Sequence, residues 1–379
     1  MSQSATETSQ EHRHGLLHCD LDALWASLSP EQIEPWHGQI SNWTGKSDEL
    51  RRNLPLLEVL AQFREADLEP LRTLALELRA NSDDIVFVGS SQMLDLARLQ
   101  ELFDGPGGRG PRLHLPRSKA WEHQLLPALE AVGSRVSVVI LGWSPGELLW
   151  ERGVPPALAW MKGRYSEAEL HRRVVGLSSR SMGQLLQYPM RHVNVVERAF
   201  LAPIYSGFGL FPLYLAGFEA SSLIEGARSQ VRALEKSWSL DNATLRYAVL
   251  RQILTMQEGW VEAVVTPDSF LEPLGLWCLR LLETSCQHLD PPIPYPFPHL
   301  QCQEHDSHPA ERPHYYELQL DYASPGLDSS LMDRGRPRCW LGMPRLDMYT
   351  LGGCISHLAT SVALNHRWSE IESPPVETE

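Results

Sequence analysis

Residues 83–103 read DDIVFVGSSQMLDLARLQELF, and this stretch decides the fold class. A short apolar run, a Gly-Ser-Ser turn and a helical pattern follow one another, which is how a strand, a turn and a helix open a parallel α/β sheet. The pattern continues with an expected strand at 111–115, a helix at 121–131, and strands at 136–141 and 174–178. The run VSVVIL at 136–141 is apolar throughout, as is typical of a parallel strand buried on both faces.

The second half of the chain repeats this alternation. A helical pattern at 242–258 precedes VEAVVTP at 261–267, which we expect to be a strand that ends in a turn. A long apolar helix is expected at 271–286, an alternating strand at 315–322 and a closing amphipathic helix at 350–368. We therefore predict an α/β protein built from two doubly wound parallel-sheet lobes.

The predicted organisation has four parts. An N-terminal arm covers 1–52, a first lobe 53–190, a second lobe 191–345, and a C-terminal helix with its tail 346–379. The proline-dense segment 291–313 favours neither a helix nor a central strand.

Composition excludes several classes of protein. The net charge of -14 and a pI near 5.5 argue against a nucleic-acid surface, because phosphate backbones favour clustered Lys and Arg. The six cysteines form no CxxC pair, which favours reduced thiols in a cytoplasm. No run of 18 apolar residues exists, so we expect a cytoplasmic protein with no membrane contact. We expect neither a metal nor an organic cofactor.

The stretch Glu197–Ala227, ERAFLAPIYSGFGLFPLYLAGFEASSLIEGA, is the first candidate site. Arg198 precedes a Pro/Gly-punctuated loop that opens into an apolar helix. Helix N-termini bind anions, and a guanidinium offers a flat, permanently charged fork to a phosphate or an oxyanion. The alternative is that Gly and Pro only form the cap while Arg198 pairs with a surface carboxylate.

Three ordered segments together resemble the glucose-6-phosphate isomerase family, whose members contain two sugar-isomerase (SIS) lobes. The Glu197–Ala227 stretch is similar to the family signature in which GGR precedes S-x-x-G-L and L-A-G. FLEPLGLWCLRLLETSCQH at 270–288 looks like the helix that ends in ESxGK. MPRLDMYTLGGCISHLATSVALNHRWSEIESPPVE at 343–377 resembles the C-terminal helix and its GVExGK tail, although PPVETE has no counterpart of the lysine.

The resemblance implies roles for three residues. Glu283 falls on the glutamate that moves a proton between C1 and C2 of the open-chain sugar, and Arg198 on the arginine that stabilises the cis-enediolate intermediate. His305, in QEHDSH, is the candidate for the histidine that opens the sugar ring, with His308 second. In the family this histidine reaches a partner's active site, which implies a homodimer. Glu283 could instead pair with Arg280, and the histidine-bearing loop could be without function.

The predicted substrate-binding residues are Gly89, Ser90, Ser91 and Ser144, which fall on the family's two phosphate-binding turns. The family uses an S-K-[ST]-x-T-T run in the second turn, whereas this chain reads LGWSPGELL. Trp143 occupies a position at which a lysine would help to bind the phosphate, and Pro145 removes a backbone N–H donor. Lys119, Arg164 and Arg180 are possible replacement donors.

Three functions therefore remain open. The chain is an isomerase that interconverts glucose 6-phosphate and fructose 6-phosphate, a catalytically inactive homologue that binds a sugar phosphate or has a structural role, or a two-lobe protein that handles another phosphorylated metabolite. Arg198 and Glu283 favour the first, and the altered phosphate turn favours the second.

Overall fold

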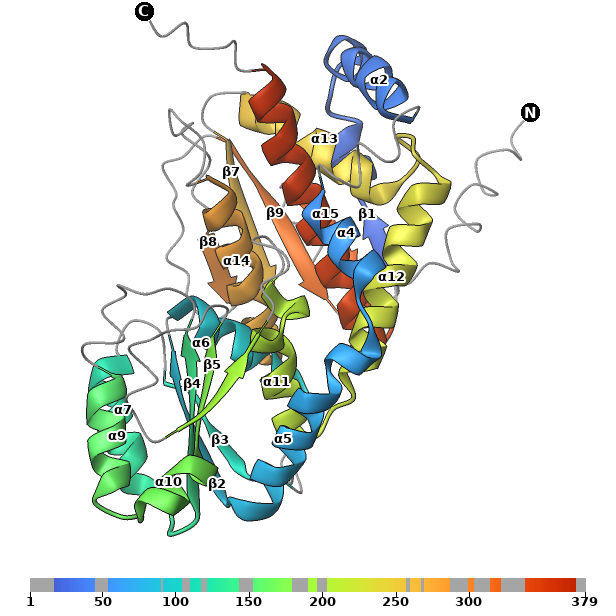
Figure 1. The fold of residues 1–379 in the computed structure, drawn as a ribbon. Helices are drawn as coiled ribbons and strands as arrows, with labels where there is room; N and C mark the ends of the chain where they lie inside the picture. The colour runs from blue at the N-terminus through green and yellow to red at the C-terminus, as the bar shows by residue number, and fades with distance from the viewer. Residues whose placement is uncertain are drawn as a thin grey trace, which may run out of the picture. The chain divides into compact units, whose positions relative to one another are not determined.

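The structure is a computed structural model that describes residues 17–44, 54–89, 91–103, 110–116, 121–142, 153–178, 190–195, 203–256, 260–266, 269–286, 299–302, 314–321 and 338–372. The chain divides into two compact units. The first unit is Gln62–Ala220, and the second unit combines Met1–Ala61 with Ser221–Glu379. Each unit contains one five-stranded sheet flanked by helices (Figure 1).

The sheet of the first unit is parallel throughout and has the strand order β3-β2-β4-β5-β6. Its strands are β2 (Asp84–Gly89), β3 (Arg112–His114), β4 (Val136–Gly142), β5 (Val174–Ser178) and β6 (Arg191–Asn194). Every residue of β2, β4 and β5 is buried, as expected for strands covered on both faces.

Helices cover both faces of this first sheet. Val86 and Val88 of β2 pack with residues of α7 (Trp121–Ala131), α9 (Val154–Lys162) and α10 (Glu167–Arg173) in one apolar cluster. Successive strand residues point to opposite faces, so Ile85 and Phe87 face the other layer. That layer contains α5 (Glu69–Asn81), α6 (Ser91–Ala97) and α11 (Gly207–Ala216), which is buried from Gly207 to Leu215; Figure 1 shows these helices.

The sheet of the second unit has the order β1-β10-β9-β7-β8. Its strands are β1 (His18–Asp20), β7 (Trp260–Thr266), β8 (His299–Cys302), β9 (His314–Asp321) and β10 (Arg338–Gly342). Four of them are parallel, and β1 pairs antiparallel with β10. The helices of this unit are α1 (Asp22–Trp25), α2 (Pro30–Thr44), α4 (Pro55–Gln62), α12 (Ala220–Lys236), α13 (Ala243–Met256), α14 (Glu272–Cys286) and α15 (Met348–Glu372).

The two sheets share a winding order. In the first, the chain forms β2, adds β3 on one side, and then adds β4 and β5 on the other. In the second, it forms β7, adds β8 on one side, and then adds β9 and β10 on the other. The fifth position differs, because parallel β6 occupies it in the first sheet and antiparallel β1 in the second. The prediction of an α/β fold with two parallel-sheet lobes is confirmed.

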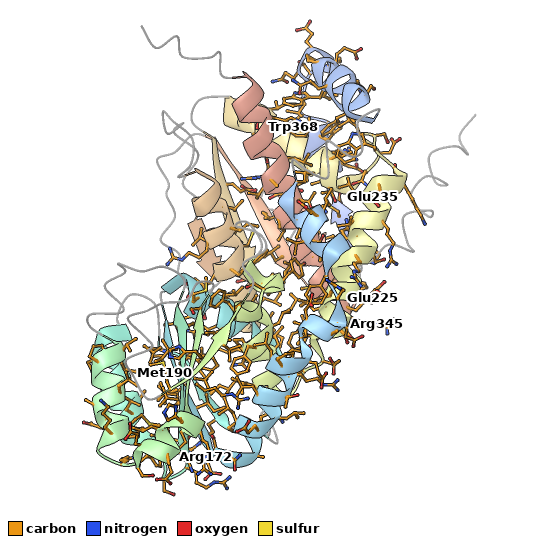
Figure 2. The ribbon with its side chains drawn as sticks, in the orientation of Figure 1. Arg172, Met190, Glu225, Glu235, Arg345 and Trp368 are labelled. Atoms are coloured by element: carbon orange, nitrogen blue, oxygen red, sulfur yellow. The ribbon has the colours of Figure 1, made fainter. Side chains whose placement is uncertain are left out.

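The N-terminal arm is an integral part of the second unit. Besides β1, it contributes α2, whose Trp36 packs on Trp368 of α15 with ring centroids 5.0 Å apart. Figure 2 labels Trp368 on α15, close to α2. The indole N–H of Trp238 also donates to the carbonyl of Ile40, at 3.2 Å. The described part of the arm therefore completes a sheet and a helical layer.

The observed units differ from the predicted boundaries at one point of functional importance. Residues 191–220 were expected to open the second lobe, but β6 pairs with β5 of the first sheet and α11 packs on α5 and α6. A short edge strand, β8, also lies within the predicted proline-rich loop. Among the described helices, none is long and apolar enough to cross a membrane.

Candidate functional site

The carboxyl edge of the first sheet contains a topological switch point between β2 and β4. From β2 the chain turns first to β3 on one side and then crosses to β4 on the other, so the segments that follow β2 and β4 diverge. Ligands of open α/β sheets bind in the crevice that such divergence leaves at the strands' carboxyl ends. Here those ends are Gly89 and Gly142.

The predicted phosphate-binding residues belong to the two segments that leave this switch point. Gly89 is the last residue of β2, and Ser91 is the first residue of α6. Ser144 follows Gly142 by two positions. Ser90 and Ser144 lie outside the described residues, as does the side chain of Ser91. The topology thus brings the two predicted turns to one place, without defining their hydroxyl groups.

Gly89 itself is closely packed. A Cβ built there would lie 3.2 Å from the Cβ of Leu141 on β4 and 3.5 Å from that of Met93 on α6. Glycine therefore lets the end of β2 approach both β4 and α6, which is the kind of close backbone approach that phosphate-binding turns use.

The chain segment that carries Arg198 leaves the same edge of the sheet. The β6 strand ends at Asn194, and the N–H of Val195 donates to the carbonyl of Ser178 at 2.8 Å, which joins the carboxyl ends of β6 and β5. Arg198 follows Val195 by three positions and lies outside the described residues. Adjacent strands are about 4.8 Å apart, so β6 is about 14 Å from β2. The segment that contains Arg198 therefore starts at the same carboxyl edge of the sheet as the switch point.

This position corrects the expectation that Arg198 opens the second lobe. It belongs to the chain range of the first unit, together with Gly89, Ser90, Ser91 and Ser144, whereas Glu283 belongs to the second unit. The segment RHVN at 191–194, which precedes the arginine and forms β6, has no run of apolar residues by which the sequence could have shown this.

Glu283 lies in the last turn of α14. This helix starts six positions after the carboxyl end of β7, packs along β7 and β8, and provides the crossover between these two parallel strands. It therefore runs back along the sheet, and its last turn lies away from the carboxyl end of β7. The side chain of Glu283 lies outside the described part of the chain.

His305 follows Cys302, the last residue of β8, by three positions. Both His305 and the alternative His308 lie outside the described residues. The chain leaves β8 at the carboxyl edge of the second sheet, and the segment returns to the amino end of β9 at His314.

Arg164, one of the possible replacement donors, lies at the opposite edge of the first sheet. Its guanidinium stacks on Trp160, 4.0 Å from the ring centroid, and donates to the carbonyl of Gly133 at 3.3 Å. Gly133 precedes the amino end of β4. A groove there is lined by Val132, Gly133, Ser134, Arg164 and Tyr165. Because the Tyr165 hydroxyl and the Arg164 guanidinium already bond to this wall, we assign no ligand to the groove.

The same amino edge holds a polar cluster that the sequence did not indicate. The fully buried carboxylate of Asp84 accepts from Arg112, from the backbone N–H of Gly133 at 3.0 Å, and from His114 at 2.8 Å. Burial by itself raises the pKa of Asp84, but the hydrogen bonds from His114, Gly133 and Arg112 outweigh it and lower the pKa below its usual value. This cluster fastens the edge strand β3 to β2, on the far side of the sheet from the switch point.

Within the described residues, no group of three or more His, Cys, Asp or Glu side chains could hold a metal ion.

Comparison with known proteins gives one sequence relative and several structural ones. The chain is 24% identical over 281 residues to a glucose-6-phosphate isomerase of Heliobacterium modesticaldum. This match covers 67% of the chain and 60% of that protein's length. No protein-family model matches the chain.

This chain is a divergent relative of the glucose-6-phosphate isomerases.

Solved structures agree on the fold. A hypothetical protein of Thermus thermophilus matches with a TM-score of 0.68 at 17% identity, over 95% of this chain and 97% of that one. A glucose-6-phosphate isomerase from Chlamydia trachomatis matches with a TM-score of 0.61 at 13% identity, over 82% of this chain and 72% of that one. The C-terminal domain of a glucosamine-fructose-6-phosphate aminotransferase from Francisella tularensis matches with a TM-score of 0.51 at 8% identity, over 83% of this chain and 96% of that one. At these identities the structural matches establish the fold alone.

Proposed function

We propose that this chain binds a six-carbon sugar phosphate at the carboxyl edge of the first sheet and interconverts glucose 6-phosphate and fructose 6-phosphate. The observation that carries the proposal is the shared origin of three segments. The segments with Ser90 and Ser91, with Ser144 and with Arg198 all leave the same edge of one parallel sheet, two of them from its switch point. The sequence relationship to glucose-6-phosphate isomerase supports the choice of ligand.

In the proposed mechanism, the phosphate group is held at the switch point by backbone N–H groups and serine hydroxyls. The Glu283 carboxylate removes a proton from C2 of open-chain glucose 6-phosphate and returns it to C1, while the proton of the C2 hydroxyl passes to O1, which yields fructose 6-phosphate. The Arg198 guanidinium stabilises the negative charge of the cis-enediolate that forms between the two transfers. His305, supplied by a second copy in a homodimer, assists ring opening.

The altered phosphate turn favours a second candidate, a homologue that binds a sugar phosphate without turning it over. Trp143 and Pro145 stand where the family has lysine and hydroxyl donors, and one lost donor of this kind weakens transition-state binding by about 2–4 kcal/mol. We accordingly expect low turnover rather than the rate of a typical isomerase.

Two measurements test the proposal. Binding is measured as the rise in melting temperature that 6-phosphogluconate produces. Turnover is measured with a coupled assay that converts fructose 6-phosphate to glucose 6-phosphate. We expect Arg198→Ala to reduce both signals and Glu283→Gln to abolish turnover while 6-phosphogluconate still binds.

Arg164→Ala is the matched control, because it removes the same charge from the opposite edge of the same sheet. It should leave binding and turnover as in the wild type. Binding without turnover in the wild type would select the second candidate. No thermal response to 6-phosphogluconate, with no turnover, would refute both.

A further inference from the structure

We propose that a basic face at the amino edge of the first sheet binds an acidic peptide segment of a partner protein. The face consists of four side chains from one stretch of the chain: Lys162 ends α9, Arg164 lies in the turn that follows, and Arg172 and Arg173 end α10. The β5 strand starts directly after Arg173, which places the face at the amino edge, and Figure 2 labels Arg172 on α10. The switch point lies at the opposite edge, so a peptide bound here occupies a second site that the proposed function does not use.

None of these four cations forms an ion pair with a carboxylate of the described residues. Other arginines of the same edge do, namely Arg112 with Asp84, Arg135 with Asp83 and Arg191 with Glu77. The side chains of Lys162, Arg164 and Arg172 are exposed, and that of Arg173 is half-buried. The chain has more acidic than basic residues, yet these four neighbouring basic side chains keep a positive charge that a partner can neutralise.

The ends of two helices explain these residue types but not the lack of carboxylate partners. Basic side chains are favoured in the last turn of a helix, where the helix dipole is negative, and acidic ones in the first turn. The first turn of α10 accordingly contains Glu169, which accepts from the backbone N–H of Ser166 at 3.0 Å and from its hydroxyl at 2.8 Å. This carboxylate therefore caps the helix and forms no ion pair with Arg172 or Arg173, about one turn further along.

Two guanidinium groups of the face are already held in place by aromatic rings. Arg164 stacks on Trp160 at 4.0 Å from the ring centroid, and Arg173 stacks on Tyr165 at 4.7 Å. Nη1 of each guanidinium donates to backbone carbonyls, at 3.2 to 3.3 Å. A guanidinium has five N–H donors, so each retains donors with which to bind a carboxylate. Because stacking holds the planar groups, little side-chain freedom is lost when a carboxylate binds.

The distribution of charge favours a peptide over a nucleic acid as the partner. The first unit has as many acidic as basic residues, so the whole net charge of -14 belongs to the second unit. A nucleic acid has a dense row of phosphates and is repelled by a negatively charged molecule over most of its length. An acidic peptide has few charges and needs only local complementarity, since salt screens exposed charges beyond about 8 Å.

The test measures the fluorescence anisotropy of labelled hexaglutamate as full-length protein is added. We expect binding at about 50 mM NaCl and a weaker complex at about 300 mM, because salt screens exposed charge pairs. The double variant Lys162→Glu with Arg172→Glu reverses two exposed charges of the face and should raise the Kd about tenfold. Its melting temperature checks that the variant is folded.

Lys236→Glu with Arg345→Glu is the matched control. Lys236 is the last residue of α12, as Lys162 is the last residue of α9, and both Lys236 and Arg345 are exposed. This double variant therefore makes the same change of charge, on the second unit. It should leave the Kd of hexaglutamate within about twofold of the wild type.

Absence of hexaglutamate binding at low salt, or an equal loss in the two double variants, would overturn the proposal. A single-stranded oligonucleotide of equal charge serves as the competing ligand. If it bound more tightly than hexaglutamate and lost its affinity in Lys162→Glu with Arg172→Glu, the face would bind nucleic acid instead. A wild type that neither binds 6-phosphogluconate nor turns over fructose 6-phosphate would refute the proposed function and leave this second site unaffected.

Discussion

Arg251 and Glu262 form an ion pair of 3.0 Å in the interior of the second unit, where their side chains are 6% and 3% exposed. The pair is part of a network that joins β7 to two helices. The Tyr247 hydroxyl donates to the other carboxylate oxygen at 2.5 Å, and Nη1 of Arg251 donates to Asn365 of α15 at 2.9 Å. Each charge therefore has a specific partner, and losing one partner leaves the other buried without compensation.

The first prediction concerns this pair. Arg251→Met should lower the free energy of unfolding by about 3–5 kcal/mol, because the Glu262 carboxylate then stays buried without its counter-charge. Urea denaturation followed by circular dichroism measures the change. Arg72→Met is the control, since Arg72 pairs with Glu219 at 3.3 Å on the surface and such pairs contribute at most about 1 kcal/mol. Equal losses of unfolding free energy in the two variants would show that the buried pair stabilises the fold no more than the surface pair does.

The second prediction concerns Asp84 and acid stability. The pKa of Asp84 is lower in the folded chain than in the unfolded one, so its ionised form stabilises the fold above the unfolded pKa of about 3.9. That contribution disappears as pH falls through the folded pKa. Asp84→Asn should therefore be less stable than the wild type at pH 7, and the difference should shrink from about pH 4 downward.

Asp83→Asn is the neighbouring control for this experiment. Its carboxylate is 56% exposed and pairs with Arg135 at 3.3 Å on the surface. Thermal unfolding at intervals between pH 7 and pH 2 compares the three proteins. If the difference in melting temperature between the wild type and Asp84→Asn stayed constant over this pH range, it would contradict the lowered pKa of Asp84.

The third prediction concerns His357, which lies in α15 between Thr244 and Tyr247. Burial lowers the pKa of His357 to about 4, and its Nδ1 lies 2.9 Å from the Thr244 hydroxyl. The unfolded chain takes up this proton near pH 6.5, so the unfolded state binds more protons and stability falls as pH drops from about 6.5 to about 4. The loss over this window amounts to roughly 3 kcal/mol.

In His357→Gln this part of the pH dependence should vanish, whereas the exposed His37→Gln should retain it. The measurement is the slope of unfolding free energy against pH between 4 and 6.5. This range lies above the acid window of Asp84, so the two effects separate. An unchanged slope in His357→Gln would assign the pH dependence to another group.

Local patterns in the sequence predicted those helices and strands whose own apolar residues show which side faces the core. The helix expected at 121–131 is α7, and the apolar run at 136–141 is β4, because periodicity alone specifies which residues face the core. The strand, turn and helix of residues 83–103 likewise form β2 and α6. These segments define the switch point, so this edge of the candidate site could be predicted from sequence.

The elements that sequence reasoning missed depend on distant partners. The β1 strand has three residues and exists through its pairing with β10, more than 300 positions away. The β6 strand has four residues and an exposed Arg191 at its start, so it has no run of apolar residues to mark it. Because β6 was not predicted, Arg198 was assigned to the second lobe, whereas its chain range belongs to the first unit. Long-range pairing decided both cases, and local patterns contain no record of it.

A close contact between α12 and α15 of the second unit leads to the last prediction. A Cβ on Gly226 of α12 would lie 1.7 Å from the carbonyl oxygen of Tyr349, and one on Gly352 of α15 would lie 1.9 Å from that of Leu223. The helices thus cross backbone to backbone, each at its own glycine. A methyl group at either position cannot be accommodated by a side-chain rotation, since the atoms it meets belong to the main chain.

Gly226→Ala and Gly352→Ala should each destabilise the fold by about 3 kcal/mol or more, because α12 and α15 must separate. Gly38→Ala provides the control with the opposite sign. Gly38 lies inside α2 with nothing within 4 Å of a built Cβ, so alanine there should stabilise the protein by about 0.5–1 kcal/mol through helix propensity. The melting temperatures of the three variants give their order of stability. A melting temperature of Gly226→Ala equal to that of the wild type would refute the backbone contact between α12 and α15.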